Sequence, residues 1–316
     1  MKPKIAIIGA GVSGCFLSHL LHEKADVTLF EKSRGVGGRC SNRRDDSGDV
    51  FHHGAQFFTI RDQDIQNYIQ PLVDAGTVKE FSDDLVFYKN RENPPEKAIH
   101  SIRYVGCPHM NSFLKFWVRS VSCRLQFEVK ELRKDQSTWS IVSDTQEEKG
   151  FDLCVVTTPI PQASKLTHDL LVYPNIQAAP CYAVMLTTPS YKTSWVGAFI
   201  KNSPLSWVAH HAGQEKDQWI LHGSPSWSSE QRDEGQVCKS LTTELSCLLN
   251  KKIEVYSQKI HFWRYASIQS GESLKPFLWD ASHSLGACGD WYQGGRVEGA
   301  LQSAYRLEQW LRANEF

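Results

Sequence analysis

The N-terminal part of the chain combines short apolar runs with one helical pattern. Ile5–Ile8 has the length and residue types of a buried parallel strand. Val12–Glu23 has the pattern of a helix, and Val27–Phe30 that of a second strand, which Glu31 closes. A strand, a helix and a second strand in immediate succession predict the opening unit of an α/β protein.

Weaker patterns of the same two kinds follow along the chain. Helical spacing of apolar residues predicts helices at Asp62–Gly76, Met110–Val121 and Ser228–Leu249, the last with Ser229 as a possible N-cap. Strand-like runs predict a hairpin from Leu125–Val129 and Trp139–Val142, and buried strands at Phe151–Thr158 and Leu285–Asp290. A last helix is expected to start near Val297 and run to the terminus.

Tryptophans recur at intervals of twelve residues in the second half of the chain. Trp195, Trp207 and Trp219 each lie in a β-type run with turn residues between the runs, which predicts an antiparallel meander. Each tryptophan could simply fill the core, because large aromatic residues dominate burial in any sheet domain. As a set, they could instead form an aromatic wall for a flat heteroaromatic substrate.

Three glycines join the first predicted strand to the first helix. Gly9, Gly11 and Gly14 have the G-x-G-x-x-G spacing of a dinucleotide-binding turn. Gly9 allows the tight turn, Gly11 lets the backbone approach a pyrophosphate, and Gly14 permits close contact between helix and strand. The helix N-terminus offers N–H groups to the phosphates, and Glu31 is placed to bind the ribose hydroxyls. The alternative is a tight strand-to-helix turn in an unrelated α/β protein.

A second glycine cluster follows Glu31 and ends in an arginine. Gly35, Gly37 and Gly38 would let another backbone segment approach the diphosphate, with Arg39 pairing against its charge. The alternative is a surface loop with a solvated arginine. The fingerprint, the acidic residue and Gly-Gly-Arg together resemble the flavin-containing amine oxidase superfamily. That resemblance implies FAD as the cofactor, and because Cys288 is expected in the core, we expect the FAD to be non-covalent.

The segment Asp49–Thr59 resembles one branch of this superfamily more than the others. It predicts a short strand that runs into a turn at Gly54, where a missing side chain would let the flat isoalloxazine ring approach the backbone. An ordinary strand end with buried phenylalanines is the alternative. Together with the segments around Trp207, Trp219 and Trp263, this stretch resembles the renalase-like branch of the superfamily.

The end of the chain supplies another glycine-rich helix start. In the resembled superfamily, Asp290 would bind the ribitol phosphate region of FAD. The helix beginning near Val297 would point its N-terminus at the flavin pyrimidine and stabilise the negative charge of the reduced ring. A valine, for which Val129 is our candidate, would pack its backbone over the adenine.

The resemblance implies a discontinuous FAD-binding site. We expect an α/β fold with a Rossmann-type FAD-binding domain of the glutathione-reductase-like kind (residues 1–60, 100–165 and 280–316) and an inserted α+β substrate domain with an antiparallel sheet (61–99 and 166–279). The expected cofactor-binding residues are Gly9, Gly11, Val12, Ser13, Gly14, Glu31, Lys32, Gly38, Arg39, Gly54, Ala55, Gln56, Phe57, Val129, Thr158, Pro159, Gly289, Asp290, Arg296, Val297 and Ala300. The candidate pocket residues are Gln56, Phe57, Trp207, His210, Trp263, Tyr265, Trp291 and Tyr292.

Composition limits the partners of the protein. Lysine plus arginine total 35 and aspartate plus glutamate total 35, which argues against nucleic acid or an anionic membrane as the main partner. The nine cysteines are odd in number and form no C-x-x-C pair, which predicts reduced thiols and a cytoplasmic location. No zinc-binding spacing of Cys and His occurs, so we expect no metal site. The expected partners are a small-molecule substrate and O2, with no obligate protein partner.

The resemblance implies an FAD-dependent oxidase. Its donor would be 2- or 6-dihydro-NAD(P), a dihydronicotinamide dinucleotide reduced at C2 or C6 of the ring. This donor would give hydride to flavin N5, and O2 would then reoxidise the flavin and yield hydrogen peroxide. Losing hydride makes this donor aromatic, so little acid–base machinery is needed and no catalytic side chain is assigned. The alternatives are a flavin amine oxidase for a small amine, to which Trp291 and Tyr292 could contribute an aromatic cage, and a flavin-binding protein without turnover.

Overall fold

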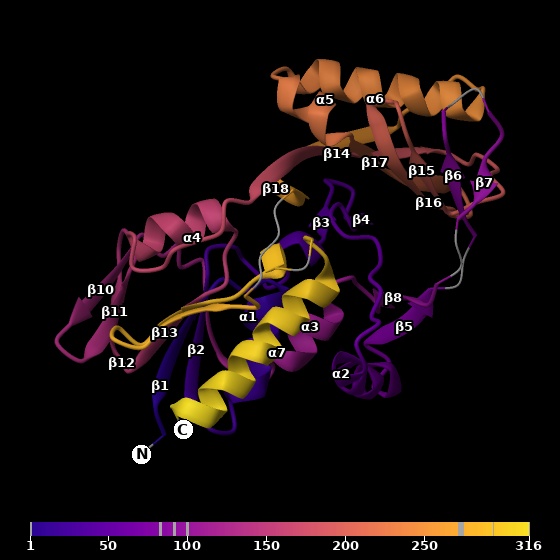
Figure 1. Cartoon of the computed structure of the whole chain (residues 1–316). Coiled ribbons are helices and arrows are strands. Elements are labelled where there is room, and N and C mark those ends of the chain that lie inside the picture. The colour runs from indigo at the N-terminus through magenta and orange to yellow at the C-terminus, as the bar shows by residue number, and fades with distance from the viewer. Residues whose placement is uncertain are drawn as a thin grey trace.

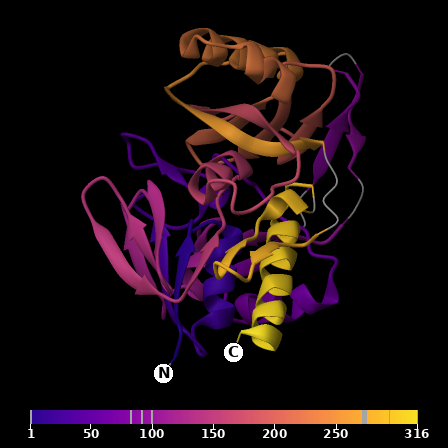
Figure 2. The ribbon, with the colours of Figure 1, turned by 60° about the vertical axis from the view of Figure 1, so that its left-hand side comes forward.

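The computed structural model describes residues 2–81, 84–90, 93–98, 101–270, 275–292 and 294–315. The chain folds around two large sheets, a mostly parallel one in the lower part of Figure 1 and a mostly antiparallel one in the upper part. Both termini lie at the lower end, beneath the parallel sheet, and a view turned by 60° keeps this arrangement (Figure 2). The mixed α/β class expected from the sequence is confirmed.

The lower sheet has six strands, with β1 (Lys4–Ile8) near its centre. β1 pairs in parallel with β2 (Asp26–Glu31) on one side and β13 (Leu153–Val156) on the other. The remaining strands are β9 (Ser122–Leu125), parallel to β2, β20 (Leu285–Ala287), parallel to β13, and the antiparallel edge strand β19 (Leu278–Asp280). Segments from the start, middle and end of the chain therefore share one sheet, as the pattern of buried runs predicts.

Alternate residues of β1 enter two different cores. Ile5 and Ile7 pack with the helices α1 (Val12–Leu21), α2 (Gln63–Asp74), α3 (Ser112–Trp117) and α7 (Val297–Asn314). Ala6 and Ile8 face a three-stranded sheet and the helix α4 (Ile160–Thr167). The strands of this sheet are β10 (Glu131–Asp135), β11 (Thr138–Val142) and β12 (Glu147–Phe151). Because both faces are covered, β1 has no polar alternation, which is typical of a parallel strand.

The upper sheet has seven strands and a helical layer on one face. Its strands, in spatial order, are β18 (Ser257–Ser270), β14 (Gln177–Pro189), β17 (Lys216–Gly223), β16 (Leu205–His211), β15 (Gly197–Ile200), β6 (Leu85–Tyr88) and β7 (Glu96–Lys97). β15, β16 and β17 are successive antiparallel neighbours, so the predicted meander is confirmed. The helices α5 (Pro225–Glu230) and α6 (Glu234–Leu249) form the layer, and α6 supplies buried residues to the core beneath it.

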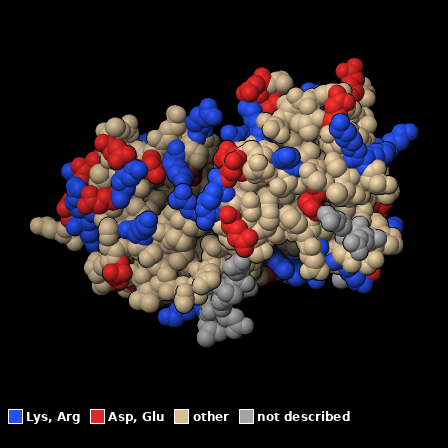
Figure 3. Space-filling model, turned by 90° about the horizontal axis from the view of Figure 1, so that it is seen from above, with Lys and Arg blue, Asp and Glu red and all other residues tan. Residues whose placement is uncertain are grey.

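The other face of the upper sheet meets a segment of the lower part. Phe51 and Phe57 pack with Met185, Trp207 and Ile220 of this face. The two-residue strands β3 (Arg43–Arg44) and β4 (Val50–Phe51) form a hairpin there, and β5 (Val78–Phe81) pairs with β8 (Arg103–Gly106). The short helices η1 (Gly38–Cys40) and η2 (Asp290–Tyr292) complete the fold. Seen from above, lysine and arginine are interspersed with aspartate and glutamate (Figure 3).

Two predicted elements are wrong in detail. The strand expected at Leu125–Val129 ends at Leu125, because Gln126 adopts a positive φ of 56° that interrupts the extended backbone. The hairpin partner of Trp139–Val142 is therefore β10 and not this strand. The helix expected at Ser228–Leu249 is two helices, and its N-cap is Asp233, whose carboxylate accepts a hydrogen bond from the Gln236 N–H at 3.1 Å. Ser229 lies inside α5 and donates to the carbonyl of Ser226.

The position of α2 bears on the domain boundary. Its buried residues Ile65, Ile69 and Leu72 belong to the same core as Ile5 of β1. We therefore propose that the lower domain includes residues 61–81, and that the excursion into the upper sheet begins at β6. No helix within the described residues is long and apolar enough to cross a membrane.

Candidate cofactor-binding site

The two N-terminal glycine clusters contact each other. The N–H of Gly37 donates to the carbonyl of Ala10 at 2.8 Å. A Cβ atom placed on Gly38 would lie 3.3 Å from the Cα atom of Gly11, so a larger residue would crowd the first loop. We name as the cofactor cradle the residues Gly9–Gly14, Gly37–Arg39, Thr157–Pro159, Gly289–Asp290 and Arg296–Ala300.

The three fingerprint glycines occupy three different environments. A Cβ atom on Gly14 would lie 1.9 Å from the carbonyl oxygen of Gly9, so only glycine lets α1 start this close to β1. Gly9 itself has a φ of 105°, which favours glycine. A Cβ atom on Gly11 would meet no protein atom within 4 Å. Gly11 therefore faces open space, where the backbone is accessible to a ligand.

Glu31 lies at the end of β2 beside the first loop. Its carboxylate accepts the N–H of Ala10 at 2.9 Å and the N–H of Ser33 at 2.8 Å. A carboxylate offers about four acceptor sites, so capacity remains for the two hydroxyls of a ribose. Lys32 follows as an exposed residue, and Val129 packs at the edge of the second core cluster.

The two helix starts from opposite ends of the chain meet in space. The hydroxyl of Ser13, in the first turn of α1, donates to the carbonyl of Ala300, in the first turn of α7, at 3.0 Å. Figure 1 shows α7 lying along α1. Gly11 is the N-cap of α1 and the exposed Arg296 is the N-cap of α7. The unpaired N–H groups of both helices are thus available on one side of the sheet.

Arg39 and Asp290 form an ion pair that joins the two ends of the cradle. The guanidinium donates to the Asp290 carboxylate at 2.8 Å and to the carbonyl of Ala266 at 3.3 Å. Burial opposes the charge of Arg39, but the nearby Asp290 carboxylate outweighs it, so the pKa of Arg39 is raised. Arg39 was expected to face a diphosphate; its guanidinium instead binds the residue that was expected to reach the ribitol phosphate region.

The end of β13 completes the cradle. The hydroxyl of Thr157 lies 2.8 Å from the Gly9 carbonyl and 3.0 Å from that of Ile8, which fixes the turn out of β1. The hydroxyl of Thr158 is buried and has no hydrogen-bond partner within the described chain. A buried polar group normally has a partner, so Thr158 is suited to bind a ligand oxygen. Pro159 is the N-cap of α4.

The segment after His53 is fixed against Arg39. The N–H of Ala55 donates to the Arg39 carbonyl at 2.9 Å, and a Cβ atom on Gly54 would lie 2.0 Å from the same oxygen. The side-chain amide of Gln56 turns back onto its own segment, toward the carbonyls of His52 and Gly54. Gln56 is therefore better placed to shape this segment than to reach into a pocket.

Phe57, Trp207, Trp263 and Tyr265 lie where the upper sheet meets the lower part. Phe57 and Trp207 are in contact, with ring centroids 5.8 Å apart. Trp263 and Tyr265 come from β18, and Tyr265 lines a narrow cleft together with Arg39, Asp290 and Trp291. We use the name candidate pocket for the region between these residues and the cradle.

His210 faces the opposite side of its strand. Trp207 and Ala209 point toward Phe57, whereas Val208 packs into the core under α6 because side chains alternate along a strand. The His210 ring stacks on Trp219 at 4.0 Å, in that same core. We therefore leave His210 out of the candidate pocket.

Asp217 is the buried partner of His210 and should control acid stability. It is fully buried and accepts hydrogen bonds from His210 at 2.8 Å, Tyr191 at 2.7 Å and Gly213 at 3.1 Å. Burial would raise the pKa of Asp217, but these hydrogen bonds outweigh it and lower the pKa. Its stabilisation is thus complete above the ordinary pKa of 3.8 and is lost as the pH falls through the lower folded-state value.

We expect Asp217→Asn to lower the free energy of unfolding by about 2–4 kcal/mol at pH 7, with a smaller difference from wild type below pH ~3.5. Urea denaturation as a function of pH measures this. Asp280→Asn is the matched control, because Asp280 also pairs with a histidine, His283 at 2.6 Å, but is partly exposed; it should cost less than about 1 kcal/mol. Equal effects of the two substitutions would contradict the assignment.

Trp291 and Tyr292 pack mainly into the second core. Both side chains are buried, and their ring centroids lie 4.1 Å apart. Trp291 also contacts Tyr173, at 5.7 Å. Only Trp291 reaches the narrow cleft beside Arg39. The pair is therefore part of the floor beneath the cleft, and we propose no aromatic cage from it.

Sequence reasoning missed several residues of the site. Asn111, from the turn before α3, donates its side-chain amide to the carbonyl of Val36 at 2.8 Å and so supports the second glycine cluster. Nothing in its local sequence marks it, because the contact depends on the tertiary fold. Thr157 could have been noticed, since it stands beside Thr158 at the end of a predicted strand. The roles of His53 and His222, described below, also depend on contacts between the two sheets.

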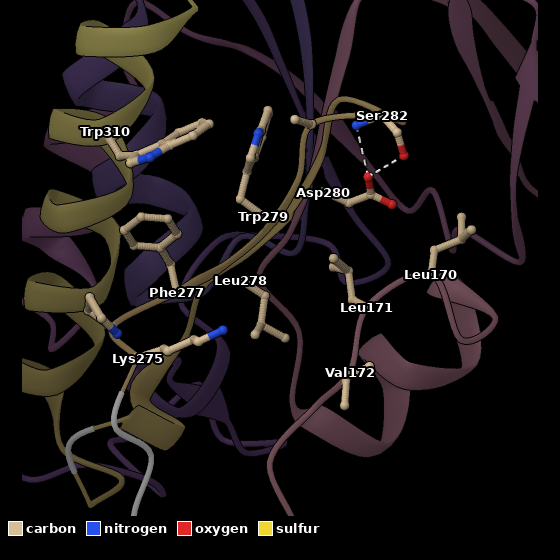
Figure 4. Close-up of a pocket in the computed structure, with 12 residues that line it drawn as sticks. Leu170, Leu171, Val172, Lys275, Phe277, Leu278, Trp279, Asp280, Ser282 and Trp310 are labelled. Atoms are coloured by element: carbon tan, nitrogen blue, oxygen red, sulfur yellow. Dashed lines mark hydrogen bonds between the residues drawn. The ribbon is translucent and has the colours of Figure 1, made fainter.

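A separate hollow of about 740 Å³ lies away from the cradle (Figure 4). It is lined by Leu170–Val172, the stretch Lys275–Ser282 and Trp310. Trp310 is thirteen residues beyond Val297 on α7, about 20 Å along the helix axis. The residues that line the hollow include none of the cradle residues, and we assign the hollow no role in the site.

Comparison with known proteins agrees with this geometry. Residues 7–73 match the family of the NAD(P)-binding Rossmann-like domain. A stretch of 74 residues is 39% identical to UDP-galactopyranose mutase of Mycoplasma pneumoniae, covering 22% of this chain and 18% of that protein. The mutase of Mycoplasma genitalium is 33% identical over 76 residues, which are 23% of this chain and 19% of that protein. The match thus spans less than a fifth of each mutase.

Solved structures match over the whole chain. An Exiguobacterium sp. 255-15 protein assigned as a protoporphyrinogen oxidase has a TM-score of 0.79 at 9% identity, with all of both chains covered. Putrescine oxidase has a TM-score of 0.73 at 11% identity, covering 99% of this chain and 100% of that one. Cyclohexylamine oxidase of Brevibacterium oxydans IH-35A has a TM-score of 0.72 at 10% identity, with the same coverage. The chain has a Rossmann-type dinucleotide-binding domain within the two-sheet fold of these oxidases.

Proposed function

We propose that the protein binds FAD non-covalently and is an FAD-dependent oxidoreductase. Bound FAD would accept a hydride at N5 and pass the electrons to O2, giving hydrogen peroxide. For the donor we propose a small organic molecule, in particular a 2- or 6-dihydro-NAD(P), as in the renalase-like branch that the sequence resembles. The observation that carries the cofactor assignment is the contact between the starts of α1 and α7 across the Ser13–Ala300 hydrogen bond.

The cradle residues fit a dinucleotide. Gly11 leaves open space beside the N-terminus of α1, and the buried hydroxyl of Thr158 has no partner within the described chain. Glu31 would bind the ribose of the adenosine half, and the helix N-termini would stabilise the phosphates. Asp290, which pairs with Arg39, would bind the ribitol phosphate region of the flavin half, as Glu31 would bind the ribose. Within this proposal, the chain's own residues bind and orient the cofactor and exclude water around it.

The pairing of the carboxylates around the candidate pocket disfavours a cationic donor. Arg39 borders the cleft, and its positive charge is balanced by Asp290. The carboxylates at this interface already have cationic partners. Asp290 pairs with Arg39. In the β3–β4 hairpin, Asp46 pairs with Lys259 and Asp49 with Lys216. A protonated amine would find little negative charge here to balance its own positive charge. A dinucleotide, whose phosphates are negative, does not need a carboxylate partner.

A flavin amine oxidase is the second candidate, because the solved structures with this fold include putrescine oxidase and cyclohexylamine oxidase. An amine must lose its proton before oxidation, and histidines could accept that proton. Burial lowers the pKa of both His53 and His222, to about 3 and about 4 respectively, so both imidazoles are neutral at pH 7. They are therefore available as acceptors, although weak ones.

An anaerobic donor screen tests these functions. The purified protein should be yellow, or become so on adding FAD, and 2- or 6-dihydro-NAD, the isomers of NADH, should bleach the visible flavin band within one turnover. Exposure to air should restore the band and produce hydrogen peroxide. Bleaching by putrescine or cyclohexylamine alone would favour the amine oxidase, and no bleaching by any donor would favour a flavin-binding protein without turnover. A colourless protein that does not bind FAD would refute all three.

A further inference from the structure

We propose that Trp263 and His222 are positioning residues that fix the backbone carbonyl of His53, and thereby the segment His53–Gln56 against which the flavin ring would lie. The inference rests on the proposed function and adds to it a role for the upper sheet. In this role, the substrate domain orients the cofactor-contacting backbone, in addition to forming a wall of the pocket.

The His53 carbonyl accepts two side-chain hydrogen bonds from two strands of the upper sheet. The indole N–H of Trp263, on β18, donates to it at 3.1 Å. The Nε2 atom of His222, on β17, also lies 3.1 Å from the same oxygen. A carbonyl oxygen has two lone pairs, so these two contacts fill its acceptor capacity.

The tautomer of His222 follows from this contact. A carbonyl can only accept, so the His222 Nε2 atom must carry a hydrogen. His222 is partly buried beside the His53 segment, and burial lowers its pKa to about 4, which keeps the ring neutral at physiological pH. The neutral ring therefore donates through Nε2 throughout that range, and this hydrogen bond does not depend on pH there.

The other side of the same segment is held by the cradle. The N–H of Ala55 donates to the Arg39 carbonyl at 2.9 Å, and Arg39 also binds Asp290. The indole of Trp263 lies over the His53 imidazole, with centroids 4.8 Å apart and planes inclined by 27°. The segment is thus fixed from the upper sheet at His53 and from the lower domain at Ala55, with Gly54 between the two attachments.

This arrangement predicts an effect on rate rather than on cofactor affinity. Gly54 is packed against the Arg39 carbonyl, and Trp263 and His222 hold the His53 carbonyl, so losing one of these hydrogen bonds would loosen the segment at His53. Hydride transfer depends steeply on alignment, and a displacement of about 1 Å can cost about a hundred-fold in rate. In the proposed arrangement the Gly9–Gly14 loop would hold the phosphates of FAD, and the segment His53–Gln56 is not part of that loop.

The test uses Trp263→Phe in the FAD-loaded full chain. Phenylalanine keeps a ring over His53 but removes the N–H donor, so flavin reduction by the best donor should slow by about ten-fold or more. The Kd for FAD should change by less than about three-fold, and the visible circular dichroism of the bound flavin should change. Trp219→Phe is the matched control, because its buried indole donates to Thr188 at 3.0 Å on the opposite face of the same sheet.

A pair of substitutions at His222 separates the hydrogen bond from packing. His222→Gln places an amide N–H near the position of Nε2 and should retain most of the reduction rate, whereas His222→Leu should lose about as much as Trp263→Phe. Equal rates for the Gln and Leu variants, or an unchanged flavin dichroism in Trp263→Phe, would overturn the inference. Photochemical reduction separates the proposed function from the positioning role of Trp263 and His222. If no donor reduces the wild type, the proposed function fails. The dichroism and the light-driven reduction of the variants then still report on the segment His53–Gln56.

Discussion

Gly11→Ala should abolish tight FAD binding without destabilising the apoprotein. A methyl group at this position meets no protein atom within 4 Å, and Gly11 has an extended backbone with a φ of −78° that alanine adopts readily. The same methyl group would occupy the space through which the loop approaches a pyrophosphate. We expect the Kd for FAD to rise by at least about thirty-fold, while the apoprotein's free energy of unfolding changes by less than about 0.5 kcal/mol. Fluorescence titration with FAD and urea denaturation of the apoprotein measure the two quantities.

Two neighbouring glycines provide controls for Gly11→Ala. A Cβ atom on Gly35 would also meet open space, but Gly35 lies in the exposed part of the loop, so Gly35→Ala should change neither quantity. Gly14→Ala would force a Cβ atom to 1.9 Å from the Gly9 carbonyl and should destabilise the apoprotein itself. Unchanged FAD affinity in Gly11→Ala would remove this loop from the cofactor site.

Replacing Arg39 should be more destabilising than replacing its partner. Arg39→Leu would leave the Asp290 carboxylate, whose side chain is 9% exposed, without a counter-charge. We expect a loss of about 3 kcal/mol in the free energy of unfolding. Asp290→Asn should cost about 1–2 kcal/mol, because the Arg39 side chain is 31% exposed and can turn to water. Both variants should bind FAD at least about ten-fold more weakly.

The double variant Arg39→Leu/Asp290→Asn distinguishes stability from binding. It contains no unpaired charge, so it should recover more than about 1 kcal/mol of the loss caused by Arg39→Leu. FAD affinity should stay low, because neither the guanidinium nor the carboxylate is present. Recovery of FAD affinity in the double variant would show that the pair has only a structural role.

Local sequence signals were sufficient to predict the parts of the fold that form the N-terminal half of the cofactor cradle. The glycine spacing around Gly11 and the apolar run Ile5–Ile8 each depend on neighbours within a few residues, so β1, α1 and β2 could be predicted closely. The strand at Phe151–Thr158 and the helix from Val297 were also predicted, because each ends or begins at a distinct Gly or Pro signal. The predicted convergence of the two helix starts is confirmed by the contact between Ser13 and Ala300.

Other features could not be predicted, because they depend on which face of a strand is buried. Both faces of β16 are covered, one by the core under α6 and the other by the segment that contains Phe57. The run from Trp207 to His210 therefore shows no polar alternation that would separate the two faces, and nothing in the sequence indicates that His210, a candidate pocket residue, stacks on Trp219 in the core under α6. The strand expected through Val129 failed for a different reason, since a single left-handed residue, Gln126, ends it.

Under the proposed function, the contact between α1 and α7 would also determine when the protein can bind FAD. During translation, the ribosome releases the Gly9–Gly14 loop roughly 280 residues before it releases the start of α7. Until then the loop has neither the Ala300 carbonyl that binds Ser13 nor the Asp290 carboxylate that pairs with Arg39. We therefore expect capture of FAD only after the start of α7 has been synthesised, and a chain that lacks residues 290–300 should be unable to retain FAD.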